Sequence, residues 1–111
     1  MTSFDVVLVP FPFSRLEATK KRPCLVLARV QPKRLPPSVI VAMMTSQIQR
    51  LFPHDVVLKD WSHAGLPKET LVRLCKVVTL EESMIEKRLG TLAAADKRRV
   101  KTEWSGLLGK L

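Results

Sequence analysis

Short runs of β-branched and other apolar residues, separated by segments rich in proline and charge, make up most of the chain. The first run, residues 4–9, ends at Pro10 and Pro12, as expected of a strand that leads into a loop. The later runs have the length of strands and are bounded by turn-forming residues. They predict further strands at residues 24–28, 38–45, 54–58, 70–80 and 84–92.

Two of these predicted strands differ in the burial that their sequences indicate. Residues 24–28 are apolar without a break, which is typical of a strand covered on both faces. Residues 70–80 instead divide into two faces. We expect the even-numbered side chains from Val72 to Leu80, including Lys76, to face the core.

The C-terminal segment changes to a helical period. Apolar residues stand at Val100, Trp104 and Leu107, and Leu108 and Leu111 continue the same stripe. This spacing predicts an amphipathic helix that begins at about residue 94 and buries one face. Its outer face is basic and carries Lys97, Arg98, Arg99 and Lys101.

Together these elements predict a mainly β fold with a C-terminal α-helix, a single domain over residues 1–111 in which the helix caps a partly open β-barrel. Because no helices alternate with the strands, a doubly wound α/β fold is excluded. The chain has 111 residues, of which 46% are hydrophobic, enough to bury a core without disulfides. Cys24 and Cys75 belong to no metal-binding or redox motif, so we expect buried free thiols, no metal site and no cofactor.

The formal charge is +9, because 19 lysines and arginines stand against 10 aspartates and glutamates. Such an excess attracts polyanions, and it favours nucleic acid over an acidic protein or an anionic membrane. No apolar run approaches the roughly 18 residues of a membrane span, and the N-terminus lacks a signal-peptide pattern. We therefore expect a cytoplasmic protein that does not bind membranes.

Two short segments carry residues suited to phosphate chemistry. Arg22 closes a polar loop just before a proline and a buried strand, and its planar guanidinium can hold two phosphate oxygens at once. Thr45, Ser46 and Gln47 follow the third predicted strand, where they supply hydrogen-bonding groups or form an ordinary polar turn. Cleavage of RNA without a metal needs groups of this kind beside a 2'-hydroxyl that attacks the phosphate.

In order and spacing, four segments of the chain resemble the MazF/PemK family of toxin endoribonucleases: residues 5–14, 21–23, 44–47 and 71–73. The Ala-Gly-Leu at residues 64–66 and the terminal helix extend the resemblance to nearly the whole chain. It implies an SH3-like barrel, a homodimer, an antitoxin partner and sequence-specific, metal-free cleavage of single-stranded RNA. The expected products are a 2',3'-cyclic phosphate and a 5'-hydroxyl, and the expected effect is inhibition of translation and growth.

The same resemblance implies roles for single residues. Arg22 matches the family's catalytic arginine before proline and would stabilise the crowded phosphorus centre. Thr45 matches its catalytic threonine and would bind a phosphate oxygen or orient the 2'-hydroxyl. Cys75 departs from the family, because some members carry an aspartate there, and it leaves the general base unassigned. Substrate contacts are expected from Lys20, Lys21, Ser46, Gln47 and Arg73, with Phe13 stacking on an unpaired base.

Two other hypotheses stay open on the same fold: a CcdB-like gyrase inhibitor without enzymatic activity and a catalytically silent RNA-binding module. Arg22 beside a hydroxyl favours the nuclease, because a gyrase inhibitor has no need of a phosphate clamp. His54 and His63 could in principle transfer protons near neutral pH. The resemblance assigns neither of them, and we expect surface or packing roles for both.

Overall fold

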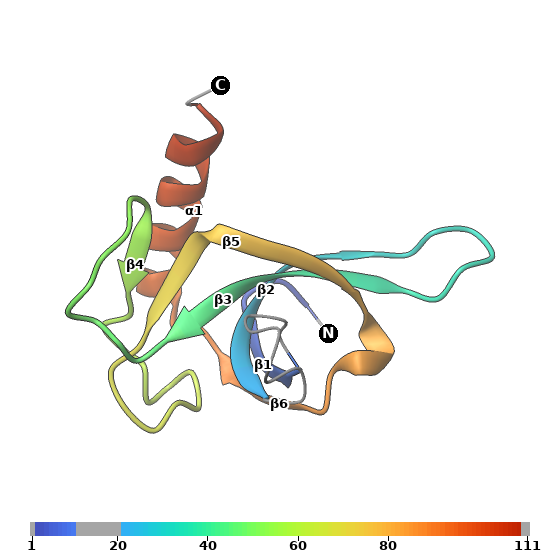
Figure 1. The fold of residues 1–111 in the computed structure, drawn as a ribbon, viewed down its shortest axis with the longest axis horizontal. Coiled ribbons are helices and arrows are strands. Elements are labelled where there is room, and N and C mark those ends of the chain that lie inside the picture. Colours follow the sequence, from blue (N-terminus) through green and yellow to red (C-terminus); the bar gives the residue numbers. More distant parts are fainter. Residues whose placement is uncertain (1, 11–20, 110–111) are drawn as a thin grey trace.

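The computed structural model describes residues 2–10 and 21–109, and within them the strands form one antiparallel sheet with a helix at its side (Figure 1). The strand order is β4-β5-β3-β2-β1-β6, and the sheet curls into the predicted partly open, mainly β architecture. The elements are β1 (Asp5–Val9), β2 (Arg22–Val30), β3 (Ser38–Thr45), β4 (Asp55–Val57), β5 (Leu71–Glu81), the 3-10 helix η1 (Glu82–Met84), β6 (Lys87–Thr91) and α1 (Ala94–Leu108).

Strand boundaries follow the predicted runs closely where both ends of a run are marked in the sequence. The third strand has the predicted bounds, whereas the second is longer at both ends and begins at Arg22 rather than after it. The last predicted strand is shorter than expected, because residues 82–84 form the 3-10 helix before β6 begins at Lys87.

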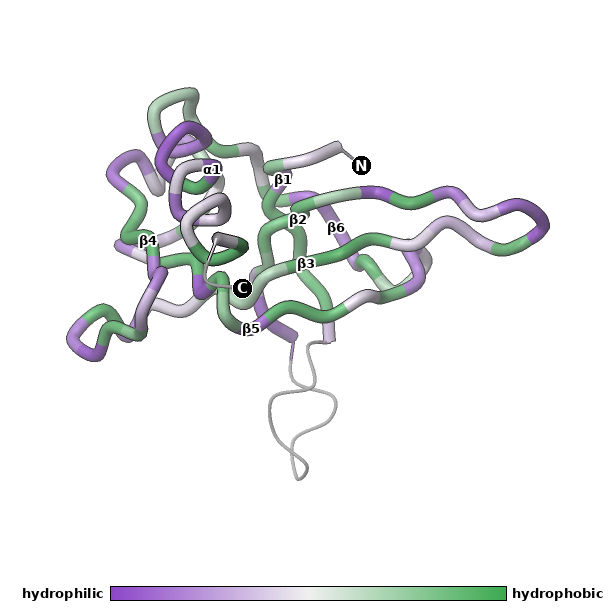
Figure 2. Tube along the Cα trace, turned by 90° about the horizontal axis from the view of Figure 1, so that it is seen from above, coloured by the Kyte–Doolittle hydropathy of each residue, from purple (hydrophilic) through white to green (hydrophobic). Residues whose placement is uncertain are grey.

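The apolar residues of the central strands are shared between two clusters on opposite faces of the sheet. On the face that α1 covers, Leu25, Met44 and Val72 pack with Val100 of the helix. On the other face, Val7, Cys24 and Val41 lie in the second cluster. Because both faces are covered, the central strands are nearly continuously apolar, as the green strand segments in Figure 2 show.

Strand β5 departs from the predicted alternation. Two successive residues of β3, Ala42 and Met43, pair with Val77 and Arg73, so residues 74–76 bulge out of the ladder. The expectation that the even-numbered side chains face the core is therefore wrong at Lys76, which is exposed. At the start of β5, residues 71–74 are all buried, because residues 71–73 lie between β3 and β4 and Leu74 packs in the first cluster.

The two thiols also differ from expectation. Cys24 is buried in the second cluster, as predicted, but Cys75 is exposed. The prediction of two buried thiols is wrong at Cys75 because this residue lies in the β5 bulge, beyond the three residues that β4 covers. Neither cysteine forms a disulfide.

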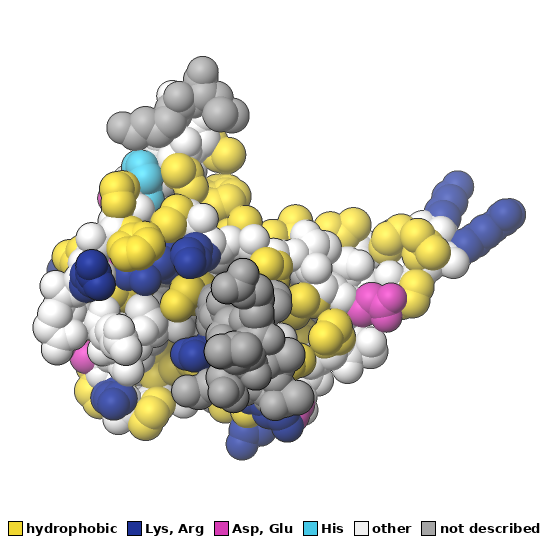
Figure 3. Space-filling model, viewed as in Figure 1, with side chains coloured by type: hydrophobic (Ala, Val, Ile, Leu, Met, Phe, Trp, Pro, Cys, Tyr) yellow, Lys and Arg dark blue, Asp and Glu magenta, His cyan; other side chains and the backbone are white. Residues whose placement is uncertain are grey.

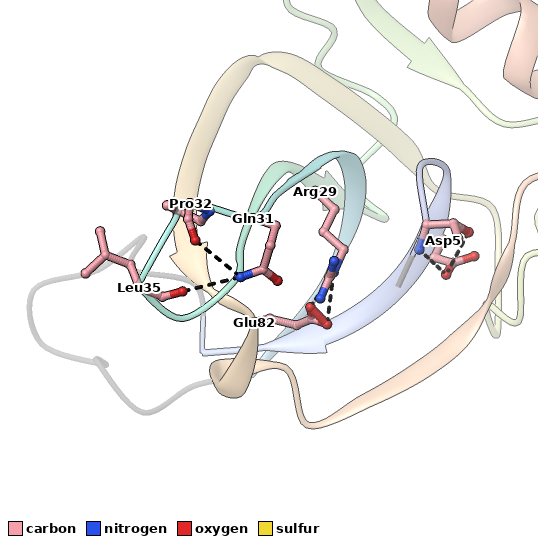
Figure 4. Close-up of polar contacts among 7 residues, drawn as sticks. Asp5, Arg29, Gln31, Pro32, Leu35 and Glu82 are labelled. Atoms are coloured by element: carbon pink, nitrogen blue, oxygen red, sulfur yellow. Dashed lines mark hydrogen bonds and ion pairs between the residues drawn. The ribbon is translucent and has the colours of Figure 1, made fainter.

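The connection between β2 and β3 projects from the sheet as a hairpin arm, residues 29–38, in which the end of β2 runs past β1 while β3 stays paired with β5 as far as Ser38 (Figures 1 and 2). Figure 4 shows how it is held: the Arg29 guanidinium donates to both carboxylate oxygens of Glu82, at 3.3 and 2.7 Å. At the turn, the Gln31 amide donates to the carbonyl oxygens of Pro32 and Leu35. Basic side chains project from the tip of the arm in Figure 3.

Helix α1 packs on the first cluster through Val100, with Trp104 and Leu107 half-buried beside it. Leu108, predicted to continue the buried stripe, is 51% exposed, because the helix ends beyond the edge of the sheet that it covers (Figure 1). Leu111 lies outside the described residues. No helix in the described part of the chain has the length and apolar character needed to cross a membrane.

A buried carboxylate near the start of α1 ties the helix to the segment after β4. Asp96 is 1% exposed and accepts hydrogen bonds from the backbone N–H groups of Lys59 (3.2 Å) and Asp60 (2.9 Å) and from Arg99 (2.8 Å). Burial alone raises the pKa of this carboxyl, but the three donors outweigh burial and hold the pKa below its usual range.

Candidate active site

The pairing of β2 with β3 places Arg22 next to Thr45. Cys24 pairs with Met43, and two steps further along both strands lead to the first residue of β2 and the last residue of β3. Directly opposed residues of antiparallel strands have Cβ atoms about 5 Å apart. The two residues singled out from the sequence therefore meet at one end of the sheet.

These two residues line one wall of a hollow of about 260 Å³, together with Ser46 and Gln47. The rest of the lining comes from the segment that precedes β5, which lies next to Thr45 because Leu71 pairs with that residue. The lining consists of Arg22, Pro23, Met44, Thr45, Ser46, Gln47, Leu66, Pro67, Lys68 and Thr70. Among the described residues that form it, the charged ones are both cations, Arg22 and Lys68, so the hollow suits an anion.

The hydroxyl of Thr45 is oriented by the chain that follows it. The backbone N–H of Gln47 donates to Thr45 Oγ1 at 3.1 Å, so one lone pair of the hydroxyl is already engaged. A hydroxyl carries one donor hydrogen in addition to its lone pairs. Thr45 can therefore donate that hydrogen to an oxygen atom bound in the hollow, and the short turn at residues 45–47 fixes the direction.

Arg22 is held by a strand, which limits the movement of its backbone. It is half-buried, and it pairs with Val9 of β1 on the side away from β3. Burial raises the pKa of the neighbouring Cys24 thiol, and the positive charge of Arg22 opposes that rise. Because burial is the larger of the two effects, Cys24 stays protonated at neutral pH.

The Arg73 side chain is held in place beside the hollow by hydrogen bonds and a ring contact. Its guanidinium donates to both Asp55 carboxylate oxygens, with the shortest contact 2.8 Å, and to the Arg50 carbonyl oxygen at 3.0 Å. The guanidinium carbon also lies 3.6 Å from the centre of the Phe52 ring. Gln47 lines both the hollow and a second hollow of about 390 Å³ with Arg50, Phe52 and Arg73.

Most of the chain matches one known protein family. The family model of the PemK-like, MazF-like toxin of type II toxin–antitoxin systems matches residues 2–104. The chain belongs to this toxin family. The resemblance seen in the sequence is thereby confirmed.

Solved structures share the fold of this toxin at low sequence identity. A mycobacterial endoribonuclease in complex with its cognate antitoxin superposes with a TM-score of 0.71 at 18% identity, covering 98% of this chain and 95% of that chain. Mycobacterium tuberculosis toxin MazF-mt6 gives 0.70 at 16%, covering 95% and 96%. The MazE-MazF structure from Deinococcus radiodurans gives 0.68 at 19%, covering 98% and 95%. Among curated proteins, none matches the sequence.

Not every predicted site residue of the toxin reaches the hollow. Lys21 is exposed, and its Nζ contacts the Glu86 carboxylate. Arg73 lines the second hollow and not the first, and its guanidinium is engaged by Asp55. Cys75 is exposed and is not among the lining residues. Phe13 and Lys20 lie outside the described residues.

Both histidines of the toxin take part in packing contacts away from the hollow. Nδ1 of His54 lies 3.1 Å from the Glu103 carboxylate of α1, and its backbone has a positive φ of 66° at the entry to β4. Nδ1 of His63 lies 3.1 Å from the Thr91 carbonyl oxygen. Neither lines the hollow, which agrees with the expectation of surface or packing roles.

The part of the hollow formed by the segment before β5 is not predicted by the sequence. Residues 59–69 lie between the strands predicted at 54–58 and 70–80, and nothing in their pattern connects them with Arg22. Lys68 and Thr70 reach the hollow because β5 pairs with β3, which brings Leu71 opposite Thr45. The one available signal was the Ala-Gly-Leu block at residues 64–66, which belonged to the resemblance but suggested no role.

Proposed function

We propose that this toxin is an endoribonuclease that cleaves single-stranded RNA at the hollow between Arg22 and Thr45, without a metal ion. The observation that supports the proposal is that Arg22 and Thr45 lie on neighbouring strand ends and line the same cationic hollow, with the Thr45 hydroxyl oriented by Gln47. Membership of the toxin family supports it, as does the endoribonuclease activity named for mycobacterial proteins of the same fold. Cleavage of messenger RNA would stop translation and growth.

The proposed reaction is an internal transesterification. The 2'-oxygen of the substrate attacks the neighbouring phosphorus and loses its proton, while the bond from phosphorus to the 5'-oxygen breaks and that oxygen gains a proton. The products are a 2',3'-cyclic phosphate and a 5'-hydroxyl. Charge accumulates on the nonbridging oxygens in the transition state, and stabilisation of that charge is the task of the site.

Arg22 and Thr45 divide this task. Arg22 contacts two nonbridging oxygens through its planar fork, and it stays charged at any physiological pH. Thr45 accepts the Gln47 N–H on a lone pair and donates its hydroxyl hydrogen to a phosphate oxygen. Ser46 and Gln47 contact the RNA beside the cleaved bond. Cys75 takes no part in the proton transfer, because it lies outside the hollow.

The proposal includes the partners of a toxin–antitoxin system. The mycobacterial structure named above contains a cognate antitoxin, and the Deinococcus structure contains MazE with MazF. For the present toxin, the charge of +9 favours an antitoxin with an acidic segment that covers the hollow and associates rapidly. A homodimer acting in the cytoplasm would bring two such hollows to one RNA.

The experiment that tests the proposal is cleavage of a long single-stranded RNA by purified toxin in EDTA. Wild type should cut it, and Arg22→Ala should cut it at least about 100-fold more slowly. Thr45→Val should also cut it more slowly than wild type. Arg98→Ala is the matched control, because it removes an exposed guanidinium that does not line the hollow. RNA binding without cleavage by wild type contradicts the proposal and supports the silent RNA-binding module. An effect confined to DNA supercoiling by gyrase indicates the gyrase inhibitor.

A further inference from the structure

We infer that Lys68 is a substrate-binding residue of this toxin, which contacts an RNA phosphate from the part of the hollow formed by the segment that precedes β5. The inference rests on the proposed function and adds a residue that neither the sequence pattern nor the family resemblance assigned. It depends on three observations: where Lys68 lies, which partners it has, and how firmly its backbone is held.

Lys68 lines the same hollow as Arg22, Thr45 and Gln47, although it comes from a different part of the chain. Its exposed side chain makes no ion pair within the described residues, whereas Lys21 contacts Glu86. Carboxylates are absent from the described lining of the hollow, so no acidic side chain there neutralises the ammonium group.

The backbone of Lys68 is fixed by a buried hydroxyl. Thr70 is 3% exposed, and its Oγ1 donates to the Lys68 carbonyl oxygen at 2.8 Å. The Thr70 carbonyl oxygen accepts the N–H of Leu58 at 3.0 Å, and the next residue, Leu71, pairs with Thr45. Lys68 is therefore tied, through the hydrogen bond to Thr70 and the pairing of Leu71, to the strand end that carries Thr45.

The turn before Lys68 packs closely against β6. Gly65 has a φ of 81°, and a Cβ atom there would lie 2.0 Å from the Leu89 carbonyl oxygen. A Cβ atom on Gly90 would lie 2.5 Å from the Ala64 carbonyl oxygen. The turn and β6 thus approach each other at a distance that only two glycines allow, while Ala64 and Leu66 are buried in the core. The backbone of the segment that leads to Lys68 is therefore held in place by packing.

A fixed backbone with a flexible, charged side chain suits contact with a phosphate whose position varies. Lysine presents a point charge on a four-carbon stem, whereas the guanidinium fork of Arg22 requires a defined geometry. Arg22 thus holds the phosphate that is cleaved, and Lys68 holds a neighbouring phosphate of the same strand. Such a contact contributes affinity with little preference for the base, and it weakens as salt rises.

The test measures RNA binding separately from cleavage. The probe is a single-stranded RNA of mixed sequence made wholly of 2'-O-methyl nucleotides, which lack the attacking hydroxyl, and its binding is followed by fluorescence anisotropy in EDTA at several salt concentrations. The variants are Lys68→Met, Lys68→Arg and, as a charge-matched control, Lys59→Met, because Lys59 is exposed and does not line the hollow.

Lys68→Met should bind about fivefold more weakly than wild type in dilute salt, and its slope of log affinity against log salt should be shallower by about 0.7. Lys59→Met and Lys68→Arg should stay within about twofold of wild type. Equal affinities and slopes for Lys68→Met and Lys59→Met overturn the inference.

Cleavage of ordinary RNA by the same wild-type preparation is scored separately. If wild type binds the probe but never cleaves RNA, the proposed nuclease activity fails, while the comparison of the two methionine variants still decides the role of Lys68. If wild type neither binds nor cleaves RNA, both fail.

Discussion

Removing the Asp55 carboxylate should destabilise the protein strongly, because it leaves the Arg73 guanidinium buried without its counter-charge. The side chains of Asp55 and Arg73 are 1% and 9% exposed, and the Asp55 carboxylate accepts three of the four hydrogen bonds that the guanidinium donates. Breaking one side of such a buried pair typically costs about 3–5 kcal/mol. The remaining contacts of Arg73, with the Phe52 ring and the Arg50 carbonyl oxygen, do not replace a negative charge.

Asp55→Ala should therefore lower the free energy of unfolding, measured by urea denaturation at pH 7, by about 3–5 kcal/mol. For a domain of this size, the melting temperature should fall by about 12 °C or more. Asp60→Ala is the control, because Asp60 is exposed and lends only its backbone N–H to a hydrogen bond. We expect it to change stability by less than about 0.5 kcal/mol.

A double-mutant cycle separates the ion pair from other effects of the substitution. Arg73→Met keeps much of the side-chain volume but removes the charge, so Asp55→Ala combined with Arg73→Met leaves no charge unpaired. The double variant should be more stable than the sum of the two single losses predicts, by about 2 kcal/mol. Additive losses, or a cost of less than about 1 kcal/mol for Asp55→Ala alone, would refute the reasoning.

Three further predictions concern other parts of the molecule. Cys75→Ala should leave the RNA cleavage rate within about twofold of wild type, because Cys75 lies outside the hollow, and single-turnover assays at one pH measure this. Gly65→Ala should lower the free energy of unfolding, measured by thermal denaturation, by more than about 2 kcal/mol, because a Cβ there meets the Leu89 carbonyl oxygen. Asp96→Asn should lower the free energy of unfolding at pH 7. Since folding lowers the Asp96 pKa below 3.8, its contribution is complete above that value, and the gap to wild type in pH-dependent denaturation should shrink as pH falls below it.

The sequence was most informative where local pattern decides structure. The third strand was predicted to the residue, since its apolar run is bounded by a proline-rich loop on one side and polar residues on the other. The start of α1 was predicted equally well from its periodicity. The β5 bulge was not predictable, because it depends on how β3 and β4 lie against that strand, and Lys76 and Cys75 were misplaced for this reason.

The candidate site was predictable to the same extent. Arg22 and Thr45 were singled out from the sequence, and the register of β2 with β3 brings them together. Lys68 was missed, because its position in the hollow follows from the pairing of β5 with β3 rather than from any local motif. Arg73 was predicted to contact RNA, but its guanidinium is engaged by Asp55, a contact created by the pairing of β4 with β5.

The most direct test of the central claim is the chemistry of the cut ends. An RNA that wild type cleaves is remade with a single 2'-deoxynucleotide on the 5' side of the cleaved bond, and both forms are incubated with the toxin in EDTA. The ribose form should yield a 2',3'-cyclic phosphate and a 5'-hydroxyl by mass spectrometry, and the deoxy form should stay intact at that bond. Cleavage of the deoxy form at an equal rate, or products with 3'-hydroxyl and 5'-phosphate ends, would contradict the proposed reaction at Arg22 and Thr45.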